Sequence, residues 1–376
     1  MMRLELDLWR IHNPDGIKVV ASLIFDRPFA GELTFLLGRN LSIESIDGGQ
    51  ECGIEAVDEF YRQANKITVS IPNEIIKLEF CYSGRPEGWF NFLTNDVFAV
   101  NSYSAWYPDK ISLGDADVLV RFHDTSFAHV VNAKYDDIGQ FWQYRPKDFD
   151  CNILAFKKPK SLRDDALDLF YIDGEGAGMA AKAYFTAYME AAEFCIDLFG
   201  SPLLEKNVLV VVPEGSGGGV GYCRKNLIVL SGFMSDISIA RHIIAHEIAH
   251  FWCKGAAADT WEDWLNETTA EWAALLFEIR SGRTAIFDAA VKGKLSKNRD
   301  LPAIKTPDGS RPDGVHDKGV CLFYRVYEKY GYVAIVEMLR IFCNLSVKTT
   351  DSYILALRTK FNPDIAAMID SGVDLV

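Results

Sequence analysis

Hydrophobic and polar residues alternate along much of the first 157 residues. Alternation with a period of two is typical of β-strands that bury one face, and Gly, Pro, Asn and Asp residues separate the runs as turns. No helical pattern of comparable strength interrupts them. Short strands at regular spacing favour a β-sandwich or an open barrel, and we expect a sandwich. The clearest runs are residues 18–25, 32–37, 66–71 and 117–122.

The pattern changes after residues 156–161, a basic stretch that contains Pro159. We therefore predict two domains, residues 1–157 and residues 158–376, the second of them a mixed α/β domain. Apolar residues at helical spacing predict a helix over residues 180–199, which Gly200 closes. Beyond it we predict strands at residues 207–212 and 226–231, three helices that end near residues 254, 282 and 331, and two or three more helices up to residue 376.

One predicted helix contains the pattern H-E-x-x-H, from His246 to His250. Residues four apart on a helix lie about 40° apart around the axis and about 6 Å apart along it, so both imidazoles can bind one small ion. Neutral imidazoles suit zinc. Glu247, beside the ion, can take a proton from water and pass it to a leaving group.

The surroundings of the motif favour a helix. Ser235 or Asp236 can cap its start, and Gly255 follows its last turn. Apolar residues between these points recur at helical spacing. His242 lies one turn before His246, too far along the axis to bind the same ion, so we expect it to have a structural role or to support a ligand.

A catalytic zinc site usually has three protein ligands and one open position. Glu267 and Glu271 are one turn apart on the next predicted helix and share a face. One of them can bind the metal, while the other accepts the second ring proton of a ligating histidine and fixes its tautomer. Without the histidine motif, a solvated helix face would be the better interpretation of this pair.

The H-E-x-x-H motif and the later segment Trp264-Leu265-Asn266-Glu267 together resemble the aminopeptidase N family of gluzincin zinc metallopeptidases. The resemblance implies a thermolysin-like α/β zincin domain after the β-sandwich, without the helical C-terminal domain of large family members. It also implies one zinc ion per chain, bound by His246, His250 and Glu267, with Glu247 as general base. Glu271 is similar to the acid that supports a ligand histidine in thermolysin-like enzymes. Sixteen residues separate His250 from Glu267, against about eighteen in the family pattern, so we expect a tighter connection.

Residues 215–222 form a glycine-rich connection between the two predicted strands. It lacks the Gly-Lys-Ser/Thr ending of a P-loop and does not fit G-x-G-x-x-G, which argues against nucleotide binding. A strand edge without side chains can instead pair with an extended peptide, and a flexible hairpin with no ligand role is the alternative. The family carries a G-x-M-E-N motif here, whose Glu binds the substrate's amino group. This chain lacks the Met-Glu-Asn, so we expect altered recognition of the substrate's N-terminus. The expected substrate-binding residues are Gly217, Gly218, Gly219, Val220 and Gly221.

Peptide hydrolysis also calls for a donor to the developing oxyanion. Residues 315–324 resemble the family's Y-E-K-G helix start, whose tyrosine is this donor, and His316 stands at the tyrosine's position. Thermolysin-like enzymes use a histidine for the same task, so His316 is our candidate catalytic donor. If His316 caps the helix instead, then Tyr324, Tyr327 or Tyr222 could serve.

Composition narrows the range of partners. The net charge of −13 argues against a nucleic-acid groove or an anionic membrane surface. No run reaches the ~18 apolar residues of a membrane span, and the acidic start does not resemble a signal peptide, so we expect a cytoplasmic protein. Eight cysteines without short paired spacings fit reduced thiols.

The resulting hypothesis is a zinc metallopeptidase that acts on a peptide or protein substrate. The sequence leaves its oligomeric state open. The competing hypothesis is a non-catalytic zinc protein whose β-sandwich binds a partner, with the second domain as a scaffold. Glu247 favours the enzyme, because a purely structural zinc site has no need of a carboxylate beside the metal.

Overall fold

The computed structural model describes residues 2–59, 61–146, 150–200, 203, 205–215, 217, 219–297 and 300–374. The chain divides into two compact units. None of the described helices is long and apolar enough to cross a membrane. The first unit comprises Met1–Ser161, Phe170–Asp173 and Val210–Val220, and the second comprises Leu162–Leu169, Gly174–Leu209 and Gly221–Val376.

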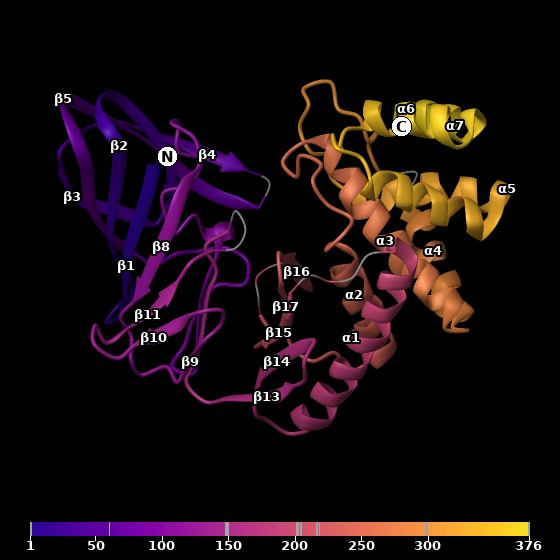
Figure 1. Cartoon of the computed structure of the whole chain (residues 1–376), viewed down its shortest axis with the longest axis horizontal. Helices are drawn as coiled ribbons and strands as arrows, with labels where there is room; N and C mark the ends of the chain where they lie inside the picture. The colour runs from indigo at the N-terminus through magenta and orange to yellow at the C-terminus, as the bar shows by residue number, and fades with distance from the viewer. Residues whose placement is uncertain are drawn as a thin grey trace. The chain divides into compact units, whose positions relative to one another are not determined.

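The first unit contains two β-sheets (Figure 1). The larger has the order β10-β11-β8-β1-β2-β5-β3, with β4 also paired to β5, and the smaller has the order β6-β7-β12-β9. Leu4 and Leu6 of the larger sheet share one buried cluster with Phe98 and Ile153 of the smaller, so the sheets pack face to face. The expected β-sandwich is confirmed. The strands are β1 (Met2–His12), β2 (Asp15–Gly38), β3 (Leu41–Asp47), β4 (Gln50–Glu59), β5 (Arg62–Gly84), β6 (Phe92–Leu93), β7 (Val97–Val100), β8 (Ala116–Phe122), β9 (His129–Val130), β10 (Lys134–Asp136), β11 (Phe141–Tyr144) and β12 (Ile153–Phe156), with a short 3₁₀ helix, η1, at Ser102–Ser104.

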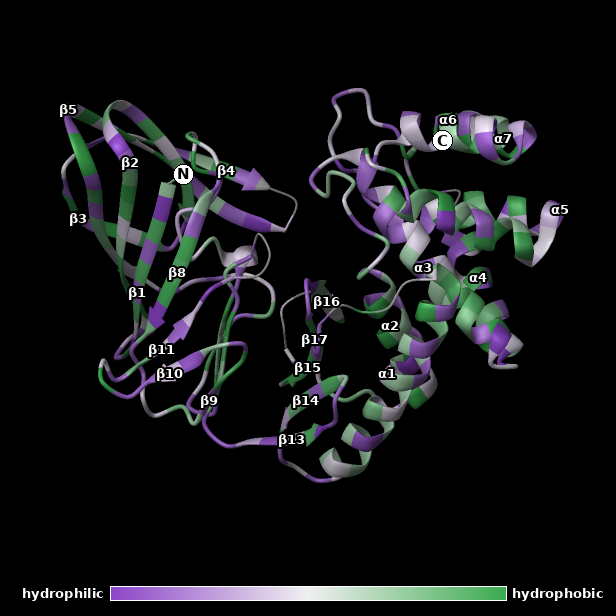
Figure 2. Cartoon of the chain, viewed as in Figure 1, coloured by the Kyte–Doolittle hydropathy of each residue, from purple (hydrophilic) through white to green (hydrophobic). Residues whose placement is uncertain are grey.

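Two of the predicted strands, residues 18–25 and 32–37, belong to the single long strand β2. Its pairing with β5 changes register between Ile24 and Phe29 and again between Phe29 and Gly31. Pro28 lies in this irregular stretch, where it cannot donate a hydrogen bond to the ladder. The strand therefore continues through a β-bulge at the place where the sequence predicts a break between two strands. Figure 2 shows apolar and polar residues alternating along β1, β2 and β5.

The remaining strands form a five-stranded sheet with the order β13-β14-β15-β17-β16, so that β16 lies at one edge. In the second unit, helix α2 packs between α1 and α3 (Figure 1). The strands are β13 (Pro159–Arg163), β14 (Leu167–Ile172), β15 (Asn207–Val212), β16 (Gly221–Arg224) and β17 (Leu227–Ser231). The helices are α1 (Ala177–Phe199), α2 (Ile237–Ala249), the short 3₁₀ helix η2 (Trp261–Asp263), α3 (Trp264–Arg280), α4 (Thr284–Lys297), α5 (Val315–Cys343), α6 (Thr350–Lys360) and α7 (Pro363–Val373).

Two helices end at other residues than predicted, and a third has no counterpart in the prediction. Helix α2 ends at Ala249 with His250 as its C-cap, instead of running on toward Gly255. Helix α5 continues past Gly331, which has non-helical angles (φ 77°), because apolar residues on both sides of this kink are buried. Helix α4 was not predicted: Phe287 and Val291 are its only buried residues, so its apolar stripe is thin.

Candidate metal centre

Helix α2 presents its histidines because its other face is fixed in the core. The Asp236 side chain accepts a hydrogen bond from Ser238 N (2.8 Å) and caps the start of the helix. Ala240, Ile244 and Ile248 are buried. His242, His246 and His250 are therefore held on another stripe of the helix. His250 keeps helical angles (φ −61°, ψ −15°), so the spacing of four residues retains its geometry at the helix end.

Helix α3 is held close to α2 by the Asn266 side chain. Its amide oxygen accepts from Ala256 N (3.1 Å), and its amide nitrogen donates to Ala256 O (3.0 Å) and to Asp263 Oδ1 (2.9 Å). Asn266 thus pins the short connection between the two helices onto the first turn of α3. Trp264 is fully buried and donates from its indole nitrogen to Thr350 Oγ1 (2.8 Å). These contacts set the position of Glu267.

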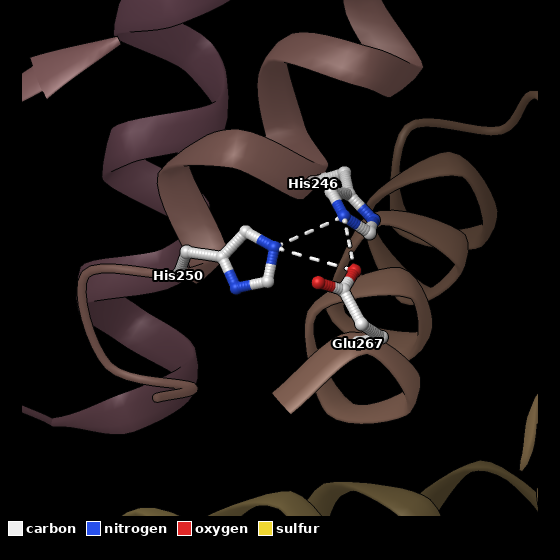
Figure 3. Close-up of side chains that lie close together, drawn as sticks. All are labelled: His246, His250 and Glu267. Atoms are coloured by element: carbon white, nitrogen blue, oxygen red, sulfur yellow. Dashed lines mark hydrogen bonds and ion pairs between the residues drawn. The ribbon is translucent and has the colours of Figure 1, made fainter. Parts of the chain in front are cut away.

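His246 and His250 from α2 and Glu267 from α3 point toward one another (Figure 3). Glu267 Oε2 lies 3.4 Å from His246 Nε2 and 3.6 Å from His250 Nε2, and the two Nε2 atoms are 3.1 Å apart. Bonds of about 2.0–2.1 Å to a tetrahedral zinc ion place its ligand atoms roughly 3.3 Å apart. The three predicted ligands thus form a triangle of the size that zinc requires.

The hydrogen bonds of the two imidazoles test whether this set fits a cation. His250 Nδ1 lies 3.2 Å from Cys253 O, which can only accept, so Nδ1 carries a proton. His246 Nδ1 lies 2.8 Å from Glu271 Oε2. In the neutral rings, both Nε2 lone pairs therefore face the same small space. A cation between them and the Glu267 carboxylate relieves that repulsion, so the donor set fits zinc.

Glu271 connects His246 to a wider network of charged side chains. Its Oε1 atom lies 3.2 Å from His242 Nε2 and 3.1 Å from Lys294 Nζ on α4. Burial opposes ionisation, but His242, His246 and Lys294 hold the pKa of Glu271 well below its ordinary value. The two residues four apart on α3 thus have different surroundings: Glu267 faces both Nε2 atoms, and Glu271 faces a ring nitrogen on the far side of His246. Sequence reasoning missed Lys294, because it lies on the unpredicted helix.

The histidine pKa values follow from the surplus of carboxylates. Burial lowers the pKa of His246, but Glu267 and Glu271 have the larger, opposite effect and raise it to about 10 in the metal-free protein. For His242, burial is again outweighed by Glu271 and Glu278, and the pKa is raised to about 9. Without a cation, the site therefore compensates its negative charge by holding protons.

Glu247 lies on α2 between the two ligand histidines and is only 6% exposed. Burial raises the pKa of its carboxyl group above the ordinary value. Gly221, the first residue of β16, packs against it: a Cβ atom at Gly221 would lie 3.1 Å from Glu247 Oε1 and 2.7 Å from Leu230 Cδ2. The absence of a side chain at Gly221 makes room for the carboxylate.

The other predicted substrate-binding residues precede β16. Gly217 and Gly219 have positive φ values of 78° and 66°, which glycine adopts readily. Val220 is 49% exposed, and Gly218 lies outside the described residues. Gly221 opens the edge strand β16, whose described partner is β17.

His316 lies on the first turn of α5, beside Glu267. Its Nδ1 atom is 3.1 Å from Glu267 Oε2, and its Nε2 atom is 2.7 Å from Arg311 Nη2. Arg311 also donates from Nε to Asp263 Oδ2 (2.8 Å). Burial and the nearby guanidinium lower the pKa of His316. Arg311 is another contributor that the sequence did not reveal, because it lies in the irregular connection before α5.

The alternative oxyanion donors have other packing roles. Tyr222 is 4% exposed, and the Arg224 guanidinium lies 4.8 Å from its ring centroid. Tyr327 packs between Trp272 and Phe287 on the described helices, with ring centroids 5.5 Å and 5.4 Å away. Tyr324 stacks on Tyr327 at 6.2 Å.

Comparison with known proteins gives matches in structure alone. No protein-family model matches the sequence, and no curated protein matches it. An M1 zinc metallopeptidase from Deinococcus radiodurans superposes with a TM-score of 0.63 at 15% identity, over 99% of this chain and 93% of that chain. A mutant of the Deinococcus enzyme bound to a Tyr-Ser-Ala substrate gives 0.61 at 14% identity, over 100% and 93%.

Native leukotriene A4 hydrolase from Saccharomyces cerevisiae gives a TM-score of 0.65 at 13% identity, over 98% of this chain and 66% of that chain. The matches to both kinds of enzyme therefore extend over nearly all of this chain. At these identities the comparison establishes the fold. The chain thus has the fold of the two-domain M1 zinc metallopeptidases.

Proposed function

We propose that this protein is a zinc-dependent peptidase in which Glu247 is the general base. One observation carries the proposal: His246, His250 and Glu267 converge with the separations of zinc ligands, and Glu247 lies on α2 beside His246. The fold shared with M1 zinc metallopeptidases supports the same reaction class.

The residues of the site have complementary tasks in this reaction. A zinc ion held by His246, His250 and Glu267 would supply Lewis acidity, lowering the pKa of the attacking water to about 7 and polarising the substrate carbonyl. Glu247 takes a proton from the attacking water and delivers it to the departing amine. Burial raises the pKa of its carboxyl group, which favours holding the proton between the two steps. Glu271 and the Cys253 carbonyl hold the two imidazoles so that their Nε2 atoms face the ion.

We propose an extended peptide as the substrate, paired along the edge strand β16. β16 lies at an edge of the five-stranded sheet, a position at which extended peptides commonly add to a sheet, and Gly221 keeps the strand close to Glu247. The chain lacks the Met-Glu-Asn that aminopeptidase N-like enzymes use at this segment. We therefore propose that recognition of a free substrate N-terminus is altered or absent.

The test compares the full chain with its Glu247→Gln variant on a panel of fluorogenic peptides with free and blocked N-termini. We expect zinc-dependent cleavage that a chelator abolishes. Glu247→Gln should bind one equivalent of zinc and lose about 10²-fold or more in rate. Glu193→Gln, at an exposed position on α1, is the matched control and should cleave like the wild type.

The outcomes separate the two hypotheses. Zinc-loaded protein that cleaves no peptide in the panel would favour the non-catalytic scaffold. Full activity in Glu247→Gln would also defeat the proposal, because another group would then have to be the general base. Cleavage restricted to blocked peptides would identify an endopeptidase.

A further inference from the structure

The contacts of His316 determine which of its nitrogens carries a proton. An arginine side chain donates hydrogen bonds and cannot accept them, so His316 Nε2, 2.7 Å from Arg311 Nη2, must be the acceptor. The proton of the neutral ring is then on Nδ1. That atom lies 3.1 Å from Glu267 Oε2, a distance that permits donation to the carboxylate.

Arg311 is well placed to hold His316 in this tautomer. Its side chain is 6% exposed, and its Nε atom donates to the equally buried Asp263 carboxylate at 2.8 Å. Asp263 is in turn fixed by the Asn266 amide, on the same first turn of α3 that carries Glu267. Asp263, Arg311 and His316 thus form a chain of contacts that begins and ends beside the metal ligand.

We propose that His316 is a positioning residue for Glu267, held in the required tautomer by Arg311, and that it does not donate to the substrate oxyanion. A ligand carboxylate that receives a hydrogen bond from a fixed imidazole is oriented toward the metal. Both ring nitrogens of His316 are then engaged within the protein. This inference rests on the metal centre of the proposed function and does not require peptidase activity.

A second metal ion is the main competing role for these residues. Donor atoms of Asp263, Glu267 and His316 lie within 4.8 Å of one another. However, Arg311 contacts two of the three, and its guanidinium remains positively charged. A permanent cation within hydrogen-bonding distance of two of the three residues opposes a second one.

The decisive measurement is the zinc dissociation constant, determined by competition with a chromophoric chelator. His316→Ala should bind zinc about tenfold more weakly or worse, since loss of such a partner typically costs about 10–100-fold in metal affinity. His316→Asn should recover most of the affinity, because its amide nitrogen takes the place of Nδ1. Arg311→Met should weaken binding in the wild type but not in the His316→Ala background, because Arg311 acts through the histidine.

A matched control is available in the β-sandwich. His123 Nε2 contacts Asp7 Oδ1 at 2.7 Å, so His123→Ala removes the same type of contact from residues outside the metal centre. Its zinc affinity should equal that of the wild type. The melting temperature of metal-free His316→Ala is the second readout, and it should stay near the wild-type value because the side chain is 46% exposed.

Three results would overturn the inference. The first is unchanged zinc affinity in His316→Ala. The second is a large fall in kcat at saturating zinc with normal zinc affinity, as expected of an oxyanion donor. The third is two equivalents of zinc in the wild type, of which His316→Ala loses one. Wild-type protein that binds no zinc would instead defeat the proposed function itself.

Discussion

Zinc binding to the His246, His250 and Glu267 centre should release protons, and the affinity should therefore rise with pH. In the metal-free protein, burial lowers the pKa of His246, but Glu267 and Glu271 raise it more, to about 10. The pKa of His250 is also raised, with Glu267 outweighing the effect of burial. Zinc requires the lone pair of each Nε2 atom, so the ion takes the place of the protons.

The sign and size of the effect follow from these pKa values. Between pH 6 and 8, which is below the pKa of His246, the metal-free ring is protonated and the zinc-bound ring is not. Release of one proton from His246 lowers the zinc Kd about tenfold for each unit of pH, and any proton released from His250 steepens this dependence. We therefore expect the zinc Kd to fall by about 10²-fold or more between pH 6 and pH 8.

Isothermal titration in two buffers with different ionisation enthalpies counts the released protons directly. Glu271→Gln is the informative variant: it removes a carboxylate that raises the pKa of His246, so fewer protons should be released at pH 8. A zinc affinity that stays constant from pH 6 to 8, with no proton release, would refute this account of the metal-free site.

Two further substitutions test the surroundings of the centre. Gly221→Ala places a methyl group 3.1 Å from Glu247 Oε1 and 2.7 Å from Leu230, so we expect a loss of about 10²-fold in kcat with unchanged zinc affinity. Equal losses in kcat and in zinc affinity would show that the substitution had also displaced the candidate zinc ligands. Lys294→Met leaves the buried Glu271 without one of its cations, and we expect zinc binding to weaken about tenfold. Unchanged zinc affinity, measured by chelator competition, would show that Glu271 stays ionised and in place without Lys294.

The approach of His246 and His250 in the candidate metal site was predictable because its geometry is local. Two histidines four apart on a helix lie on one face whatever the rest of the chain does. Spacing alone did not say which of Glu267 and Glu271 faces the candidate metal site; the resemblance pointed to Glu267, which lies near His246 Nε2 while Glu271 lies near Nδ1. The third predicted ligand lies on another helix, and local spacing cannot show that α3 packs beside α2. The resemblance of Trp264–Glu267 to a known motif provided that part of the prediction.

The residues that support the ligands were not predictable in the same way. Lys294 reaches Glu271 from α4, a helix whose thin apolar stripe gives little periodic signal. Arg311 reaches Asp263 and His316 from an irregular connection. The partner of a long polar side chain in such a segment cannot be predicted from sequence periodicity, because the contact depends on tertiary packing and not on spacing along the chain.

The distribution of charge around the centre separates the roles of its three glutamates. Glu271 has Lys294 as its cation, and Glu267 is stabilised by His316, which Arg311 holds in place. Although burial opposes it, both carboxyl groups have pKa values well below the ordinary value and remain ionised. Glu247 alone among the three has a raised pKa, because burial dominates there. Two glutamates are thus suited to holding histidines and metal, while the third is suited to carrying a proton. A catalytic site needs that difference, and a purely structural zinc site does not.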